Sequence, residues 1–153
     1  MKRNVGFVTA LLSILMLGVI WGSSLQPAGT SDAVSLGLLA RLEELFASTF
    51  GADLPLTNHL LRKIGHFSEF LLFGFLLTQA ITLLKKAKGS AVPLSLYLGL
   101  LTAVLDETIQ TFVPGRGPLV TDVLIDHAGF LIGLFLADRI CHALFHTGRN
   151  YRH

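Results

Sequence analysis

Residues 64–84 read IGHFSEFLLFGFLLTQAITLL, an apolar run that contains one histidine, His66, and one carboxylate, Glu69. Because about 20 helical residues cross the hydrocarbon core of a bilayer, this run predicts a transmembrane helix. Three further runs have the same length and character, and the four predicted spans cover residues 5–25, 64–84, 91–113 and 122–145. We therefore expect an all-α, polytopic membrane protein built on a bundle of four transmembrane helices.

The composition of the whole chain agrees with this expectation. Of its 153 residues, 52% are hydrophobic before glycine is counted and 14% are charged. Soluble domains are about 45–50% apolar with glycine included and about 25% charged. These values exclude a water-soluble globule and a disordered chain. The length suits one domain that covers residues 1–153.

The cysteine and charge content exclude other classes. Cys141 is the only cysteine, so an intramolecular disulfide and a multi-cysteine metal site are excluded. The net charge is +2, and the basic residues are scattered between apolar runs without forming a continuous patch. Nucleic acid is therefore not expected as a partner.

The first predicted span has a second interpretation. Lys2 and Arg3 precede the apolar run, which is also the arrangement of a cleavable signal peptide. The run is long for such a peptide, and the sequence SSLQ at residues 23–26 lacks the Ala-x-Ala pattern of a cleavage site. We therefore favour a span that is retained.

The distribution of charge predicts the orientation in the membrane. Basic residues flanking transmembrane helices stay in the cytoplasm. Eight of the twelve lysines and arginines fall on the side of both termini: Lys2, Arg3, Lys85, Lys86, Lys88, Arg139, Arg149 and Arg152. Nine of the ten carboxylates lie on the other side or in the adjoining halves of the spans. We expect both termini to be cytoplasmic, with the polar groups that need explaining at the outer side.

The segment between the first two spans predicts an additional helix over about residues 31–50. Ser31 or Asp32 is its expected N-cap, and Gly51 its expected stop. Apolar residues recur at helical spacing opposite charged ones: Val34, Leu38, Leu42, Leu45 and Phe46. Such an amphipathic helix lies on the outer leaflet or caps the bundle. An ordinary packed helix with a solvated face would show the same pattern.

Polar residues gather at the outer end of the second span. Arg62, His66 and Glu69 follow one another at i, i+4 and i+7, so a helix places them on one face. Glu69 lies about five residues inside the span, or roughly 8 Å deep at 1.5 Å per residue. A carboxylate at this depth is costly unless it is paired, protonated or in contact with water.

The third and fourth spans bring polar groups to the same depth. Asp106 and Gln110 are one helical turn apart near the outer end of the third span, and Glu107 accompanies them. The Pro- and Gly-rich turn VPGRGP at residues 113–118 then carries Arg116 to the outer rim.

The fourth span begins with a stripe of small and acidic residues. Asp122, Asp126, Gly129 and Gly133 stand at i, i+4, i+7 and i+11. The two glycines form a GxxxG pattern, which allows a second helix to approach closely in lipid. We favour packing inside the bundle over a homo-oligomer contact through Gly129 and Gly133. Either arrangement directs Asp122 and Asp126 away from lipid.

Ten polar residues are thus expected at one membrane depth: Arg62, Lys63, His66, Glu69, Asp106, Glu107, Gln110, Arg116, Asp122 and Asp126. Intramembrane ionisable residues indicate a functional site by default. Three fixed positive charges face five carboxylates, an excess that His66 alone cannot neutralise. Protonated carboxyls, a bound cation or a cationic headgroup would restore the balance. The alternative is that these residues merely pair and specify helix register.

Four short motifs, in this order, resemble the VanZ-like family. They are RKxxHFxEF at residues 62–70, DExxQ at 106–110, PGR at 114–116 and DVxxDxxGxxxG at 122–133. The resemblance covers about residues 60–135, and more loosely the whole chain. One departure is Asp126, where the best-known family pattern has Asn. The resemblance implies a bacterial inner or cytoplasmic membrane protein, and the namesake of the family is linked to teicoplanin resistance.

The first functional hypothesis is a site at the outer leaflet that binds or acts on a phospholipid or cell-wall precursor. Basic side chains would hold its phosphate, with Gln110, Asp122 and Asp126 as further headgroup contacts. The basic residues are Arg62, Lys63 and Arg116. Catalysis would fall to His66, Glu69, Asp106 and Glu107. A divalent cation is a possible cofactor, with His66, Glu69 and Asp106 as its candidate ligands.

The second hypothesis is a structural or accessory protein without turnover. It would bind lipid, a glycopeptide or a partner protein through the same residues, and the sequence leaves open whether the protein is an enzyme. A proton or ion pathway is disfavoured, because the cytoplasmic halves of the spans offer no polar route.

Overall fold

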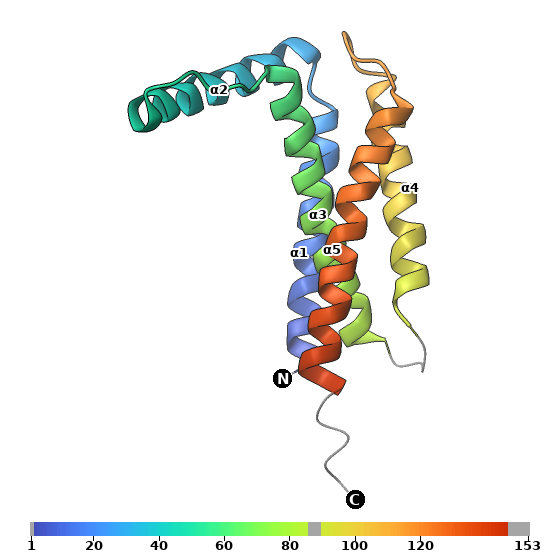
Figure 1. Ribbon diagram of the computed structural model, residues 1–153. Coiled ribbons are helices and arrows are strands. Elements are labelled where there is room, and N and C mark those ends of the chain that lie inside the picture. The colour runs from blue at the N-terminus through green and yellow to red at the C-terminus, as the bar shows by residue number, and fades with distance from the viewer. Residues whose placement is uncertain (1, 86–89, 147–153) are drawn as a thin grey trace, which may run out of the picture.

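The computed structural model describes residues 2–85 and 90–146, and in these residues the chain forms five α-helices. They are α1 (Lys2–Ser24), α2 (Ala28–Phe50), α3 (Asn58–Leu84), α4 (Val92–Gln110) and α5 (Val120–His146). The helices α1, α3, α4 and α5 run side by side as a bundle, and α2 projects sideways from one end of it (Figure 1). The four bundle helices are long and apolar enough to cross a membrane. The predicted all-α, multi-pass membrane fold is confirmed.

The centre of the bundle is the contact between α3 and α5, which depends on glycine. A Cβ atom on Gly133 would lie 1.9 Å from the Leu71 carbonyl oxygen, and one on Gly129 would lie 2.3 Å from that of Phe67. Gly74 of α3 approaches Phe130 of α5 equally closely. Small residues allow two helix backbones to meet in this way. The GxxxG face of α5 is therefore occupied by α3 of the same chain.

Aromatic and aliphatic side chains fill the space around this contact. Phe130 is fully buried, and its ring lies 5.7 Å from that of Phe73. The ring also occupies the space left by Gly99 of α4, where a Cβ would lie 2.4 Å from the nearest ring atom. Ile20 brings α1 into the same core. All four bundle helices thus share one packed interior.

The helix α2 differs from the others because the rest of the protein buries very little of its surface. Of its 23 residues, all described, only Leu39 is buried, whereas Val34 and Phe50 are 67% and 69% exposed. It begins at Ala28 with Pro27 as N-cap, so the predicted caps Ser31 and Asp32 are wrong. The predicted stop is confirmed, because Gly51 adopts the left-handed conformation with φ 65°.

The starts and ends of the bundle helices differ from the predicted spans by a few residues. The largest shift is at α3, which begins at Asn58 because the Thr57 side chain accepts a hydrogen bond from the Leu60 N–H at 3.2 Å. This longer helix includes Arg62 and Lys63. The helix α4 ends at Gln110, whereas the predicted third span continues to residue 113.

Both ends of the described chain lie at one end of the bundle. The helix α1 starts and α5 finishes there, whereas α2 and the turn between α4 and α5 lie at the opposite end, which we call the site end (Figure 1). Four of the basic residues used to predict orientation, Lys86, Lys88, Arg149 and Arg152, lie outside the described residues. A cytoplasmic location of both termini therefore stays a prediction.

Candidate functional site

Two ion pairs join the helices at the site end. Arg62 of α3 donates to the carboxylate of Asp32 on α2 at 2.5 Å, and Lys63 of α3 pairs with Asp122 at the start of α5. All four side chains are partly exposed. The first pair fixes α2 against α3, although Asp32 is 30 residues away in the sequence.

A buried hydrogen-bond network connects α1 with α4. Asp106 is fully buried, and its Oδ1 accepts from the hydroxyl of Ser24, the last residue of α1, at 2.7 Å. Its Oδ2 accepts from the Gln110 amide at 3.1 Å. Hydrogen bonds of this kind replace part of the hydration that a buried carboxylate loses. The end of α1 is therefore part of the site.

Glu107 has a different role from its neighbour. Its Oε2 accepts from the Leu119 N–H at 2.8 Å, immediately before α5 begins, and its Oε1 accepts from Gln110 at 3.2 Å. The first turn of a helix carries N–H groups without helical partners and favours negative charge. Glu107 thus joins α4 to the start of α5.

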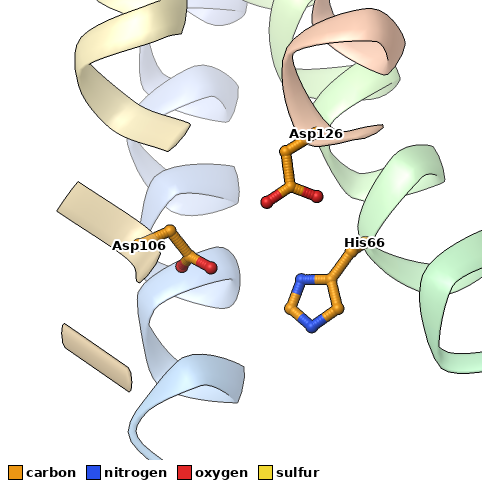
Figure 2. A group of neighbouring side chains, drawn as sticks. All are labelled: His66, Asp106 and Asp126. Atoms are coloured by element: carbon orange, nitrogen blue, oxygen red, sulfur yellow. The ribbon is translucent and has the colours of Figure 1, made fainter. Parts of the chain in front are cut away.

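Three of the predicted residues converge in the centre of the site end. His66 from α3, Asp106 from α4 and Asp126 from α5 point toward one another (Figure 2), and one ligand atom of each lies within 4.8 Å of the others. Asp126 is 1% exposed. Its Oδ1 and the His66 Nδ1 are buried and have no hydrogen-bond partner within residues 2–85 and 90–146. Glu69, a candidate metal ligand in the sequence analysis, is not part of this group.

Arg116 in the turn between α4 and α5 is incompletely paired. Its Nη2 donates to the Ser23 carbonyl at 3.3 Å, whereas Nε and Nη1 are buried without a partner. Burial, followed by the nearby positive charge of Arg62, lowers the pKa of Arg116 from its usual value. Arginine nevertheless remains protonated in proteins. The guanidinium is therefore a cation whose Nε and Nη1 find no acceptor among the described residues.

This guanidinium lines a cavity of about 230 Å³, which we call the polar cavity. Its wall includes Arg62, Lys63, His66, Gln110, Arg116 and Asp122. His59 of α3, which the sequence did not single out, also lines it. Six of the ten predicted residues thus share one cavity.

A second opening, which we call the side groove, lies between α1, α2 and α3 and measures about 380 Å³. It shares Arg62 and His66 with the polar cavity and continues past apolar side chains that include Val34 and Leu38. Glu69 lines this groove, and its Oε2 is buried without a hydrogen-bond partner. The site end therefore combines a polar cavity with an adjoining, more apolar groove.

Sequence reasoning missed two contributors to the site. From sequence, Ser24 stands out only as part of a possible cleavage sequence, although a serine at the end of an apolar span can signal a buried hydrogen bond. Asp32 is predicted as a helix cap, and nothing in its local sequence indicates its pairing with Arg62. Both contacts join residues that are far apart along the chain.

Neither a curated protein nor a solved structure matches this chain significantly. The VanZ/LLP1 family pattern matches residues 8–142. The match covers all four predicted spans in large part and includes every predicted site residue. With this extent of agreement, the chain belongs to the VanZ/LLP1 family.

Proposed function

We propose that the polar cavity binds the phosphate of a lipid or a lipid-linked cell-envelope component at the outer face of the membrane. The observation that carries this proposal is Arg116, which lines the cavity and whose Nε and Nη1 are buried without a hydrogen-bond partner among the described residues. A buried charged donor without a partner is costly, and a phosphate oxygen accepts from guanidinium in a bidentate geometry.

Two further cations support a phosphate as the ligand. Arg62 and Lys63 line the same cavity, each already beside one carboxylate. Both pairs are partly exposed, so the donors keep hydrogens that can reach a second acceptor. A phosphate with several oxygens can accept from all three basic residues at once, whereas a single carboxylate cannot.

The side groove favours a lipid over a soluble phosphate. It begins at Arg62 and His66, which also line the polar cavity, and continues along Val34 and Leu38 of α2. The exposed apolar residues of α2 suit the boundary between headgroups and acyl chains. A molecule with a phosphate and an apolar chain would thus find complementary surfaces side by side.

A specific observation also supports the second hypothesis, an accessory protein without turnover. Asp106 and Glu107 are engaged in hydrogen bonds that join α1, α4 and α5. Groups held in this way can serve to fix helix register. Such a protein would bind lipid, a glycopeptide or a partner protein. The link to teicoplanin implied by the family resemblance is compatible with either form of the proposal.

The test measures lipid binding to the purified full chain by native mass spectrometry. Phosphatidylglycerol should bind more tightly than zwitterionic phosphatidylcholine. Arg116→Gln should weaken phosphatidylglycerol binding about 10-fold or more, because a charged hydrogen bond contributes about 1.5–3 kcal/mol. Arg41→Gln on exposed α2 is the matched control and should leave the affinity unchanged.

The outcomes separate the alternatives. Equal losses in the Arg116→Gln and Arg41→Gln variants would reject the polar cavity as the headgroup site. If inorganic phosphate displaced phosphatidylglycerol and bound with the same affinity, the ligand would be a soluble phosphate. Chemical change of the bound lipid, followed by mass spectrometry over time, would identify an enzyme, and binding without change an accessory protein.

A further inference from the structure

Three helices direct metal-binding side chains at one point in the bundle. His66, Asp106 and Asp126 offer one nitrogen and two oxygen donors within 4.8 Å of one another, and Figure 2 shows their side chains facing a common centre. Three donors spread evenly around one ion at about 2.1 Å are at most about 3.6 Å apart. Side-chain adjustments of about 1 Å or less would therefore bring all three donors to bonding distance.

Two of these donors lack any other partner. Asp126 is 1% exposed, and its Oδ1 accepts no hydrogen bond from any residue that the structure describes. The His66 Nδ1 is also buried and unpartnered. Buried polar atoms are nearly always satisfied, and exceptions call for an explanation such as an ion or a water molecule. These atoms are the independent indication that something binds between them.

A small cavity is lined by two of the three residues. It measures about 10 Å³, and His66 and Asp126 line it together with Glu107, Lys63 and Asp122. A cavity of about 10–15 Å³ can hold a single water molecule or ion. The Lys63 ammonium on this wall is already paired with Asp122. Among the described residues it makes no hydrogen bond to the carboxylate of Asp126.

The balance of charge is compatible with a cation here. When the two ion pairs are set aside, Arg116 is the remaining fixed cation near four carboxylates, those of Glu69, Asp106, Glu107 and Asp126. Among the described residues none of these carboxylates has a lysine or arginine within 4 Å. Charges inside a membrane protein must be paired or neutralised. A divalent ion would compensate two of these negative charges.

The residues behind Asp106 resemble the supporting shell of a metal site. Ser24 donates to Oδ1 and Gln110 to Oδ2, which fixes the orientation of the carboxylate before any ion arrives. Each carboxylate oxygen retains a second lone pair for coordination. Such supporting hydrogen bonds orient metal ligands and increase affinity.

We infer that His66, Asp106 and Asp126 form a binding site for one divalent transition metal ion of the zinc or manganese class. The imidazole favours zinc over magnesium or calcium, and the two carboxylates are equally acceptable to manganese. Three protein ligands leave a coordination position open, as in catalytic zinc sites. The inference does not rest on the lipid proposal, because the metal ligands hold the ion without a lipid.

The test uses the full chain, purified in detergent without a polyhistidine tag and treated with a chelator. Zn²⁺, Mn²⁺ and Mg²⁺ are titrated separately by calorimetry, and bound metal is measured by mass spectrometry after gel filtration. We expect about one equivalent of Zn²⁺ or Mn²⁺ and weaker binding of Mg²⁺. Asp126→Asn, which preserves shape, should weaken binding at least 10-fold.

Glu69→Gln is the matched control, because Glu69 is an intramembrane carboxylate one helical turn from His66 but outside the group of three. Its metal affinity should equal that of the unsubstituted protein. Thermal unfolding without metal verifies that each variant folds, and added metal should stabilise the Glu69→Gln variant but not the Asp126→Asn variant. If Asp126→Asn does not fold, His66→Gln replaces it.

Two results would overturn the inference. The first is binding of less than a stoichiometric amount of Zn²⁺ and Mn²⁺ by the unsubstituted protein, which would mean that water or a proton satisfies these side chains. The second is unchanged affinity in Asp126→Asn together with loss in Glu69→Gln, which would assign the ion to a different set of ligands. Neither result depends on whether lipid binds the polar cavity.

Discussion

Single hydrogen bonds determine whether charge is tolerated at the site end. Asp106 is fully buried at membrane depth, and Ser24 and Gln110 satisfy its two oxygens. The Ser24 bond also joins helices that are 82 residues apart in sequence. Because the cost of an unsatisfied buried charge is large, the Ser24 hydroxyl should contribute to the free energy of unfolding.

The effect of this hydroxyl on stability can be measured by Ser24→Ala. The substitution removes a hydrogen bond to a buried carboxylate, so it should lower the free energy of unfolding by about 1.5–3 kcal/mol. Ser13→Ala is the control on the same helix, because Ser13 is buried but donates to the Ala10 carbonyl within α1. Denaturant unfolding of metal-free protein in detergent gives both values, and equal losses would contradict the role of Ser24.

Pairs of helices are held at a fixed offset by glycine contacts. Gly129 and Gly133 of α5 contact the α3 carbonyls of Phe67 and Leu71, one residue after His66 and five after it. The contact therefore determines how far Asp126 stands from His66 along the bundle. The glycine contacts that pack α3 against α5 thus also determine the geometry at the site end.

Gly133→Ala should separate these two helices. Its Cβ would lie 1.9 Å from the Leu71 oxygen, so we expect a loss of about 1–3 kcal/mol in unfolding free energy despite the higher helix propensity of alanine. Metal affinity should fall as well, because Asp126 moves with α5. Gly18→Ala, with nothing within 4 Å of its Cβ, should leave stability unchanged or raise it by up to about 1 kcal/mol through the helix propensity of alanine.

The unfolding free energy and metal titration of the two glycine variants are compared in the same detergent. A Gly133→Ala protein as stable as Gly18→Ala would mean that α3 and α5 are not in contact at this point.

Across the whole molecule, the bundle has one polar end and one end that carries both termini of the described chain (Figure 1). Because α2 exposes many apolar residues, we predict that this helix lies along the membrane surface at the polar end. The surplus of basic residues near the termini predicts that this polar end faces outward.

Labelling with a membrane-impermeant maleimide tests this orientation. In a Cys141→Ala background, Ser48→Cys on exposed α2 should react in intact spheroplasts. Arg139→Cys near the end of α5 should react only after the membrane is permeabilised. The reverse pattern would show that the site end faces the cytoplasm, and the proposed substrate would then have to lie in the inner leaflet.

The number of candidate spans, the helix before the second span and the gathering of polar residues toward one end of the bundle could be predicted from sequence. Each depends on local properties, namely the length of an apolar run, the helical period and the left-handed preference of Gly51. Helical spacing also predicts that Arg62, His66 and Glu69 share one face of α3. It cannot state which of them meets a residue from another helix.

That choice was made by tertiary structure. The sequence suggested Glu69 as the third candidate metal ligand, whereas the chain brings Asp126 to His66 and Asp106 and leaves Glu69 in the side groove. It also brings Ser24 to Asp106 and Asp32 to Arg62. The physical reason is that periodicity fixes faces within one helix, while the rotation and offset between helices follow from close packing at Gly74, Gly129 and Gly133.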